Sequence, residues 1–166
     1  YYTFYSIYLE SHGYSRSDIG WLWGLGVLAE VILFMLMHRV LPAVGEHRLM
    51  LWSLALSAVR WLMIGYGVDY PAVIWSAQLL HAASFATFHA AAMTLIYRHC
   101  GQGSQGQGQA VYSMLWGTGV ALGAWAAGTV WSVASAPVIF FIAAMLCVAA
   151  LALLSCRYAR TPLAPH

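Results

Sequence analysis

The hydrophobic positions of this chain gather into long runs that are separated by short polar segments. A helix needs about 20 mostly apolar residues to cross the hydrocarbon layer of a bilayer. Runs close to this length occur at five places, and few polar residues interrupt them. The predicted spans are residues 19–37, 49–66, 72–97, 110–131 and 138–156. The pattern predicts an all-α membrane protein.

A sixth apolar segment, residues 1–12, is too short to cross the bilayer. Twelve helical residues rise about 18 Å, whereas the hydrocarbon layer is about 30 Å thick. We interpret the segment as the end of a membrane helix that starts before Tyr1, and we therefore expect the chain to be a fragment. Tyr1, Tyr5 and Tyr8 share one helical face there. Their hydroxyls could bind polar groups of a ligand, or the rings could form an interfacial belt.

The composition supports a membrane location. Hydrophobic residues make up 62% of the chain and charged residues 7%, whereas soluble domains have about 45–50% and about 25%. These values exclude a soluble enzyme, a disulfide scaffold and a disordered protein, and indicate the lipid bilayer as a partner. The charge balance gives no reason to expect a nucleic-acid partner. No metal-ligand spacing, nucleophile motif or phosphate loop occurs, so neither an enzyme nor a cofactor is predicted.

Arginines predict the orientation of the spans. Five lie in connections on one side of the predicted membrane, and Arg16 alone lies on the other side. The positive-inside tendency places the arginine-rich side in the cytoplasm. That side holds the predicted loop 38–48, the connection 98–109 with its flexible polar linker 101–109, and the cytoplasmic tail 158–166. Residues 1–157 form a single predicted transmembrane domain.

Three ionisable residues lie well inside consecutive spans: Glu30, Arg60 and His81. Placing such a side chain at membrane depth costs about 2.5–3.5 kcal/mol, so each is a functional candidate. Glu30 and Arg60 could simply pair and hold two helices together. Alternatively, all three line a water-filled cavity and carry protons or substrate. Arg60 offers the permanent positive charge that would attract a carboxylate.

A stripe of polar and aromatic residues runs along the span 72–97. At about 100° per residue, its five members fall within one sector of the helix. This sector suits a cavity wall better than a lipid-facing surface, although His81 could also be an ordinary buried histidine. The stripe consists of Gln78, His81, Phe85, Phe88 and His89.

Small residues recur at four-residue spacing in two spans. Gly20 and Gly24 form one ridge, and Gly119, Gly123 and Ala127 form another. Such ridges let membrane helices approach closely, so we expect both to mediate helix contacts.

Several segments resemble the C-terminal six-helix half of a major facilitator superfamily transporter. Within the superfamily, the sequence looks most like the 3-phenylpropionate permease group, relatives of lactose permease. The likeness covers nearly the whole chain and is most specific in the first 115 residues, while residues 38–48 resemble a degenerate Gly/Arg loop motif. The segments that carry it are YYTFYSIY (1–8), GYSRSDIGWLWGLGVLAEVILF (13–34), VRW (59–61), QLLHAASF (78–85) and AVYSM (110–114).

The resemblance implies a proton symporter of the inner membrane, with H⁺ as the coupling ion. Its substrate would bind at mid-depth between two six-helix halves, so the missing N-terminal half becomes an expected partner. Glu30, Arg60 and His81 match the acidic residue, the arginine and the histidine of the eighth, ninth and tenth helices of the sugar permeases. Three residues after this histidine, the lactose-type pattern has a glutamate that carries the proton. In this chain Ser84 occupies that position. Glu30 therefore inherits proton coupling, with His81 as its competitor.

The sequence thus leads to the hypothesis of a symporter that takes up a small aromatic carboxylate such as 3-phenylpropionate. The expected substrate-binding residues come from the stripe, from Arg60 and from the short first segment. A sugar or nucleoside symporter and a non-transporting six-helix scaffold remain alternatives. The substrate-binding set is Arg60, Gln78, His81, Phe85, Tyr1, Tyr5 and Tyr8.

Overall fold

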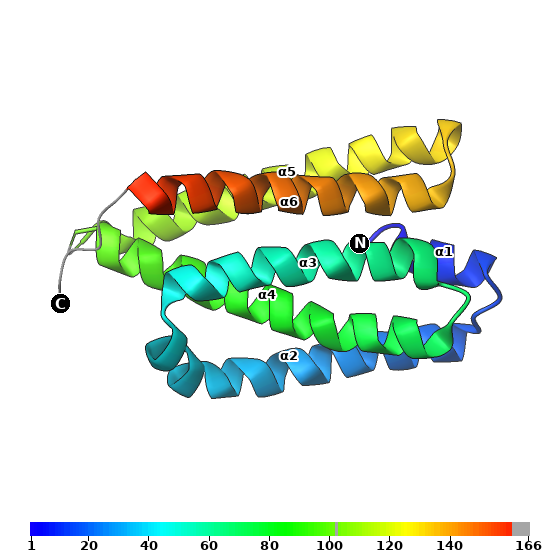
Figure 1. The fold of residues 1–166 in the computed structure, drawn as a ribbon, viewed down its shortest axis with the longest axis horizontal. Helices are drawn as coiled ribbons and strands as arrows, with labels where there is room; N and C mark the ends of the chain where they lie inside the picture. The colour runs from blue at the N-terminus through cyan, green and yellow to red at the C-terminus, as the bar shows by residue number, and fades with distance from the viewer. Residues whose placement is uncertain (102, 161–166) are drawn as a thin grey trace.

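Six helices follow one another along the chain in a computed structural model that describes residues 1–101 and 103–160, with side chains described through 158 (Figure 1). No strand occurs within this described part. The helices are α1 (Tyr5–Ser11), α2 (Arg16–Val44), α3 (Glu46–Gly67), α4 (Pro71–His99), α5 (Gln105–Val133) and α6 (Ala136–Arg160). The all-α class is therefore confirmed, and each predicted span lies within one helix.

The junction between α2 and α3 differs from the predicted loop 38–48. α2 continues through Pro42 to Val44, and only Gly45 separates it from α3. Pro42 lacks the backbone N–H that would bond to the carbonyl of His38, so α2 includes it in its last turn at the cost of one helical hydrogen bond. Gly45 has φ +86°, a conformation that glycine adopts readily, and so it turns the chain within one residue. The prediction of a loop was wrong because the end of an apolar run marks where a membrane span ends, whereas the helix itself continues beyond it.

Two other boundaries also extend beyond the predicted ones. α5 begins at Gln105, so the second half of the predicted linker 101–109 is helical, while residue 102 lies outside the described residues. α6 continues through Arg160 and includes the start of the predicted tail. Residues 161–166, the rest of that tail, also lie outside the described residues.

The start of α2 is marked by a capping box. The Asp18 backbone N–H donates to Ser15 Oγ (3.1 Å), and the Ser15 backbone N–H donates to the Asp18 carboxylate (3.2 Å). These bonds satisfy amides that the helix itself leaves free. They fix the point where the chain leaves the short α1 and enters α2.

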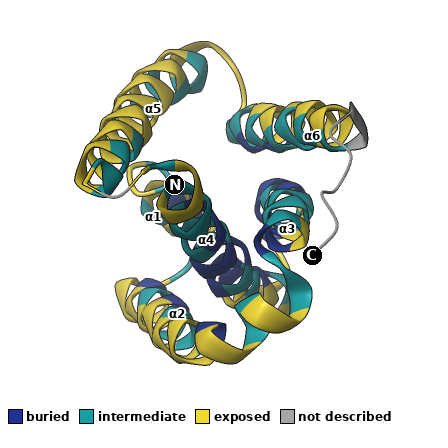
Figure 2. Cartoon of the chain, turned by 90° about the vertical axis from the view of Figure 1, so that its left-hand side faces the viewer, coloured by how far each residue is buried: buried dark blue, intermediate teal, exposed yellow. Residues whose placement is uncertain are grey.

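The helices pack around α4 and α3, as the end-on view shows (Figure 2). α3 contacts both α4 and α6, α2 packs against α4, and α5 touches α4 and α6 only lightly. Accordingly α5 contains no buried residue. The central cluster joins α1, α2, α3, α4 and α6, and includes Tyr5, Tyr8, Leu9, Leu22, Ile64, Ile74 and Phe140.

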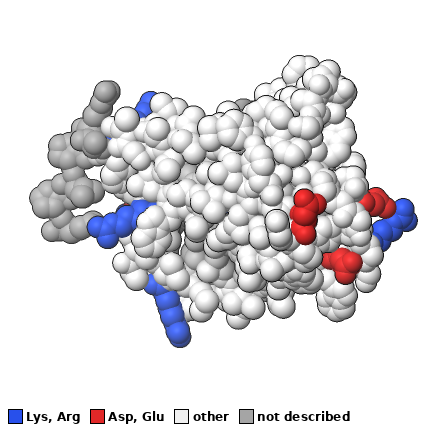
Figure 3. All heavy atoms as spheres, turned by 45° about the vertical axis from the view of Figure 1, so that its right-hand side comes forward, with Lys and Arg blue, Asp and Glu red and all other residues white. Residues whose placement is uncertain are grey.

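Four of the described helices are long and apolar enough to cross a membrane. They are α2, α3, α4 and residues 136–158 of α6, whereas α5 falls outside this group because glycines and polar residues lower its mean hydropathy. Charged atoms lie mainly towards the two ends of the face shown in Figure 3, with a broad uncharged belt between them. Such a belt is what a bilayer requires of the surface that it surrounds.

The predicted small-residue ridges do not mediate helix contacts within the described part of the chain. A Cβ built on Gly20, Gly24, Gly119 or Gly123 would meet no atom within 4 Å. The close approach lies elsewhere, at Gly65 of α3, where a Cβ would stand 2.9 Å from Phe140 Cβ of α6. Within the described chain the expected contacts of both ridges are not formed, because spacing alone does not say which face meets a neighbour.

Candidate functional site

Arg60 lies near the middle of α3, and its side chain is 4% exposed. Two aromatic rings hold its guanidinium. The Cζ atom lies 4.3 Å from the centroid of the Tyr1 ring and 4.6 Å from that of Trp61. A cation over an aromatic face is attracted by about 2 kcal/mol or more when both are removed from water. The two rings thus compensate part of the cost of burying this charge.

The hydrogen-bonding capacity of Arg60 remains incomplete. Its Nε and Nη2 atoms are buried and have no hydrogen-bond partner among the described residues. Burying an unsatisfied polar group costs about 1–3 kcal/mol, and more when the group is charged. The site therefore holds a cation with free donors, and an anionic group would satisfy them.

Glu30 does not satisfy these donors. No ion pair joins it to Arg60 in the described structure, and its half-buried side chain on α2 is not part of the cavity wall described below. The structure therefore contradicts the simple pairing of Glu30 with Arg60 that the sequence left open. It brings Arg60 and His81 to one cavity and leaves Glu30 outside.

His81 lies on α4 and is 8% exposed. Its ring centroid lies 4.9 Å from that of Tyr1 and 5.4 Å from that of Phe85, and its Nδ1 has no partner among the described residues. The stack continues to His89, whose ring centroid is 4.3 Å from that of Phe85. Four of the five stripe residues predicted from helical spacing, His81, Phe85, Phe88 and His89, therefore line the cavity, and three of them form a chain of ring contacts.

Gln78 lies one turn before His81 and is fully buried. Its Oε1 accepts a hydrogen bond from the Tyr1 hydroxyl (2.8 Å), and its Nε2 donates to the backbone carbonyl of Leu22 in α2 (2.9 Å). Both ends of the amide are thus occupied within the protein. Gln78 positions Tyr1 over Arg60 and ties α4 to α2, and it does not itself line the cavity.

Tyr5 and Tyr8 lie in the core beside the cavity and not in its wall. The Tyr8 hydroxyl donates to the backbone carbonyl of Gly65 (2.9 Å), which anchors α1 to α3. The Tyr5 hydroxyl is buried without a partner in the described structure. Of the three tyrosines on the predicted face, only Tyr1 reaches the cavity.

A cavity of about 510 Å³ opens beside Arg60, between α4, α5 and α6. It is a suitable size for a small organic ligand. One side is formed by Arg60, His81, Phe85, Phe88 and His89, the candidates from α3 and α4. The opposite side is formed by α5 and α6 and is almost entirely apolar, with Trp116, Gly119, Gly123, Ala127, Phe140 and Leu146 among its members.

Sequence reasoning missed two kinds of cavity residue. Ser57 lies three residues before Arg60 and lines the cavity with it, so the spacing test applied to the span 72–97 would have found it in the span 49–66. Gly119 and Gly123 were noticed but interpreted as packing residues. The sequence contains no local signal that distinguishes a small residue beside a cavity from one beside a helix.

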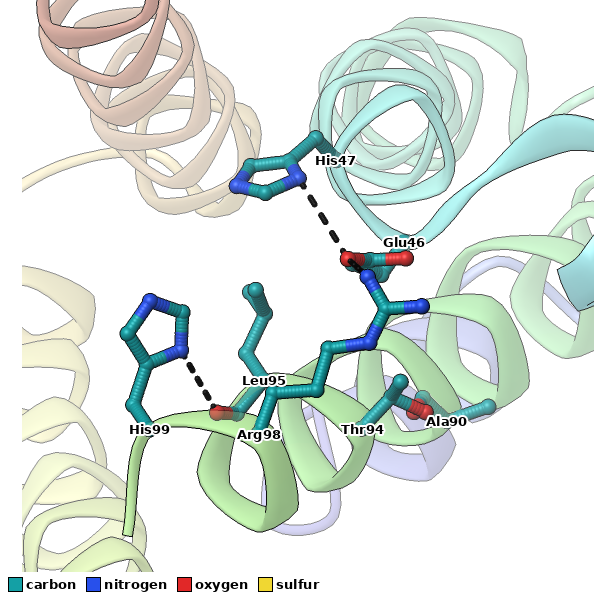
Figure 4. A network of polar contacts seen from close by, with 7 residues as sticks. All are labelled: Glu46, His47, Ala90, Thr94, Leu95, Arg98 and His99. Atoms are coloured by element: carbon teal, nitrogen blue, oxygen red, sulfur yellow. Dashed lines mark hydrogen bonds and ion pairs between the residues drawn. The ribbon is translucent and has the colours of Figure 1, made fainter. Parts of the chain in front are cut away.

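A polar cluster joins three helices at the arginine-rich end, away from the cavity (Figure 4). Arg98 of α4 donates a charge-assisted hydrogen bond to Glu46, the first residue of α3, and His47 Nδ1 lies 3.7 Å from the same carboxylate. The His47 ring also contacts Tyr158 of α6, with centroids 4.2 Å apart. Glu46 was expected at a rim or in a loop, but it is buried and connects these helices.

Comparison with known proteins adds the family context. The profile of the MFS_1 like family matches residues 1–143. A protein of Escherichia coli (strain K12) named "Probable 3-phenylpropionic acid transporter" is 40% identical over 114 residues, which cover 68% of this chain and 29% of that protein. The match thus spans less than a third of the length of this curated relative. No solved structure matches the chain significantly.

Proposed function

Because the chain belongs to the MFS_1 like family of the major facilitator superfamily, we propose that it forms the six-helix part of a proton symporter for a small aromatic carboxylate such as 3-phenylpropionate. A second six-helix half would complete the transporter and close the other side of the substrate site. We place the assembled transporter in the inner membrane, with the C-terminus of this chain in the cytoplasm.

The observation that carries the substrate class is the buried Arg60 with its free donors. A guanidinium forms two parallel hydrogen bonds with a carboxylate, and such pairs are stronger than neutral hydrogen bonds. A carboxylate at Arg60 would therefore supply the partners that Nε and Nη2 lack. The relative from Escherichia coli carries the name of an aromatic acid, which agrees with this chemistry.

The surroundings of Arg60 favour an aromatic body on the same ligand. Tyr1 and Trp61 cover the guanidinium, and His81 and Phe85 extend the wall with further rings. Aromatic pairs contribute about 0.5–1.5 kcal/mol beyond the burial of their area. A ligand with a charged end and an apolar ring would use both parts of the cavity.

We assign proton coupling to Glu30, with His81 as the competing group. Glu30 is the one acidic residue of the described chain that lies well within a predicted span. A carboxyl that approaches a positive charge in one conformation and loses it in another binds and releases a proton as the conformation changes. The separation of Glu30 from Arg60 in this structure would correspond to the second of these conformations.

The test is a binding measurement on the full-length transporter with an acid and its amide, 3-phenylpropionate and 3-phenylpropanamide. The wild type should prefer the acid, because only the carboxylate satisfies Arg60. Arg60→Lys should weaken binding of the acid by about tenfold or more, since an ammonium is a point charge and not a planar fork. Arg60→Gln should abolish the preference for the acid.

Arg48→Lys is the matched control, because Arg48 lies on the same helix but is exposed at its end. It should leave both affinities unchanged. Near-normal binding of the acid by Arg60→Lys, or an equal loss of acid and amide binding in Arg60→Gln, would show that Arg60 has a structural role only.

A further inference from the structure

We propose that the face of α5 formed by Gly119, Gly123 and Ala127 is the wall that sets substrate size in the Arg60 cavity. The ring of the carboxylate would occupy the space that these residues leave free. This inference rests on the proposed function, because it assumes that the cavity holds the substrate. It adds a specificity-determining element on a helix that the sequence had assigned to packing.

The first observation is that packing does not account for these glycines. All three residues line the cavity, and their spacing of four places them on one side of α5. A Cβ built on Gly119 or Gly123 would meet nothing within 4 Å. Glycine inside a helix is less favourable than alanine, and no close contact with a neighbouring helix in the described structure offsets that cost at Gly119 or Gly123.

The second observation, Arg60, points independently to a ligand in the same cavity. Its side chain is 4% exposed and lines this cavity, and two of its nitrogen atoms lack hydrogen-bond partners in the described structure. It therefore marks where an anionic group would bind. Whatever is attached to that group must extend along the rest of the cavity wall.

The rest of the cavity wall differs in side-chain size between α4 and α5. The α4 side carries the bulky rings of Phe85, Phe88 and His89, whereas on α5 the lining positions Gly119, Gly123 and Ala127 carry at most a methyl group, between larger lining residues such as Trp116 and Val130. The α4 rings are held in a stack, with Phe85 and His89 centroids 4.3 Å apart. A substrate ring could therefore approach the α5 backbone beside these three small residues, where an added side chain would take up part of the cavity.

The chain offers a matched control on the same helix. Gly117 is also open at its Cβ position, but it does not line the cavity. Leucine at Gly117 adds the same atoms to the same helix without entering the substrate space. A difference between this variant and the cavity variants therefore reports on the cavity and not on the helix.

The experiment measures Kd for benzoate and 3-phenylpropionate with the full-length transporter. Gly119→Leu and Gly123→Leu should weaken binding of the longer acid by about tenfold or more, because the added side chain would occupy space that this acid needs. Binding of benzoate should change by less than about twofold, since the shorter acid still reaches Arg60. Gly117→Leu should leave both affinities within about twofold.

The outcomes separate this inference from the proposed function. If the wild type binds neither acid, the proposed function fails and this inference fails with it. Suppose that the wild type binds both acids. If the cavity variants then keep the wild-type ratio of the two Kd values, only this inference is overturned. The same holds if Gly117→Leu changes that ratio as much as the cavity variants do. Should the leucine variants not fold, Gly119→Ala and Gly123→Ala are measured instead. Weaker binding of 3-phenylpropionate relative to benzoate supports this inference, and an unchanged ratio of the two Kd values overturns it.

Discussion

The ionisable side chains inside the spans have distinct surroundings. Arg60 is enclosed by aromatic rings, His81 stacks between Tyr1 and Phe85, and Glu30 is half-buried on α2 apart from both. An ionisable residue at membrane depth is retained only where something compensates its cost. For Arg60 the rings supply part of that compensation. For Glu30 we attribute its presence to the proton that it would carry.

Neutralising Glu30 tests this assignment. Glu30→Gln resembles a permanently protonated acid, so in the full-length transporter it should abolish proton-driven accumulation of 3-phenylpropionate while sparing exchange of labelled for unlabelled substrate. His81→Gln should reduce the transport rate and still allow uphill accumulation. Both are measured in proteoliposomes with an imposed proton gradient. If Glu30→Gln still accumulates substrate and His81→Gln does not, the proton belongs to the histidine.

Contacts between helices are tightest where glycine removes the side chain. Gly65 lets α3 approach Phe140 of α6, and its carbonyl also accepts the hydrogen bond from Tyr8 of α1. Three helices therefore meet at one residue. On α5, by contrast, the glycines at 117, 119 and 123 contact no neighbouring helix in the described structure.

This contrast predicts opposite effects for the same substitution. Gly65→Ala would place a methyl 2.9 Å from Phe140 Cβ and should destabilise the protein by about 1–3 kcal/mol. Gly117→Ala, in open space, should be neutral or stabilise by up to about 1 kcal/mol, because alanine is the better helix former. Unfolding of the purified full-length protein in detergent, followed by circular dichroism, compares the two. Equal effects would contradict the close approach of α3 and α6.

The two ends of the molecule differ in the connections and polar residues that they hold. The junction of α2 with α3, the connection from α4 to α5 and the end of α6 lie together at one end (Figure 1). Glu46, His47 and Arg98 interact there (Figure 4), and the His47 ring also contacts Tyr158 of α6. The connection from α5 to α6 lies at the other end. If the arginine-rich end faces the cytoplasm, the two ends must differ in access from outside the cell.

Cysteine labelling in intact cells measures that access. In the full-length protein with Cys100, Cys147 and Cys156 replaced by serine, we expect a membrane-impermeant thiol reagent to label Ser135→Cys directly. It should label Gln107→Cys only after the membrane is permeabilised. Both positions are exposed, so burial does not distinguish them. Labelling of Gln107→Cys in intact cells would reverse the proposed orientation.

The sequence by itself determined the all-α class and the approximate position of the five long helices. It also determined which ionisable residues interrupt the apolar runs and which residues of α4 share a face. These features follow from hydropathy and from the 3.6-residue period, both of which act within one segment of chain. The structure accordingly places His81, Phe85, Phe88 and His89 of α4 along one cavity wall, whereas the helices extend beyond the ends of the apolar runs and the described structure shows no helix contact at the glycines of either small-residue ridge.

Only the tertiary structure decided which helix faces meet. It placed Arg60 against Tyr1 and Trp61 and not against Glu30, moved Tyr5 and Tyr8 into the core, and turned Gly119 and Gly123 towards the cavity. The physical reason is that lipid is as apolar as the side chains that contact it. Hydropathy therefore says that a residue lies in the membrane, whereas the neighbour it meets depends on the fit between helices distant in sequence.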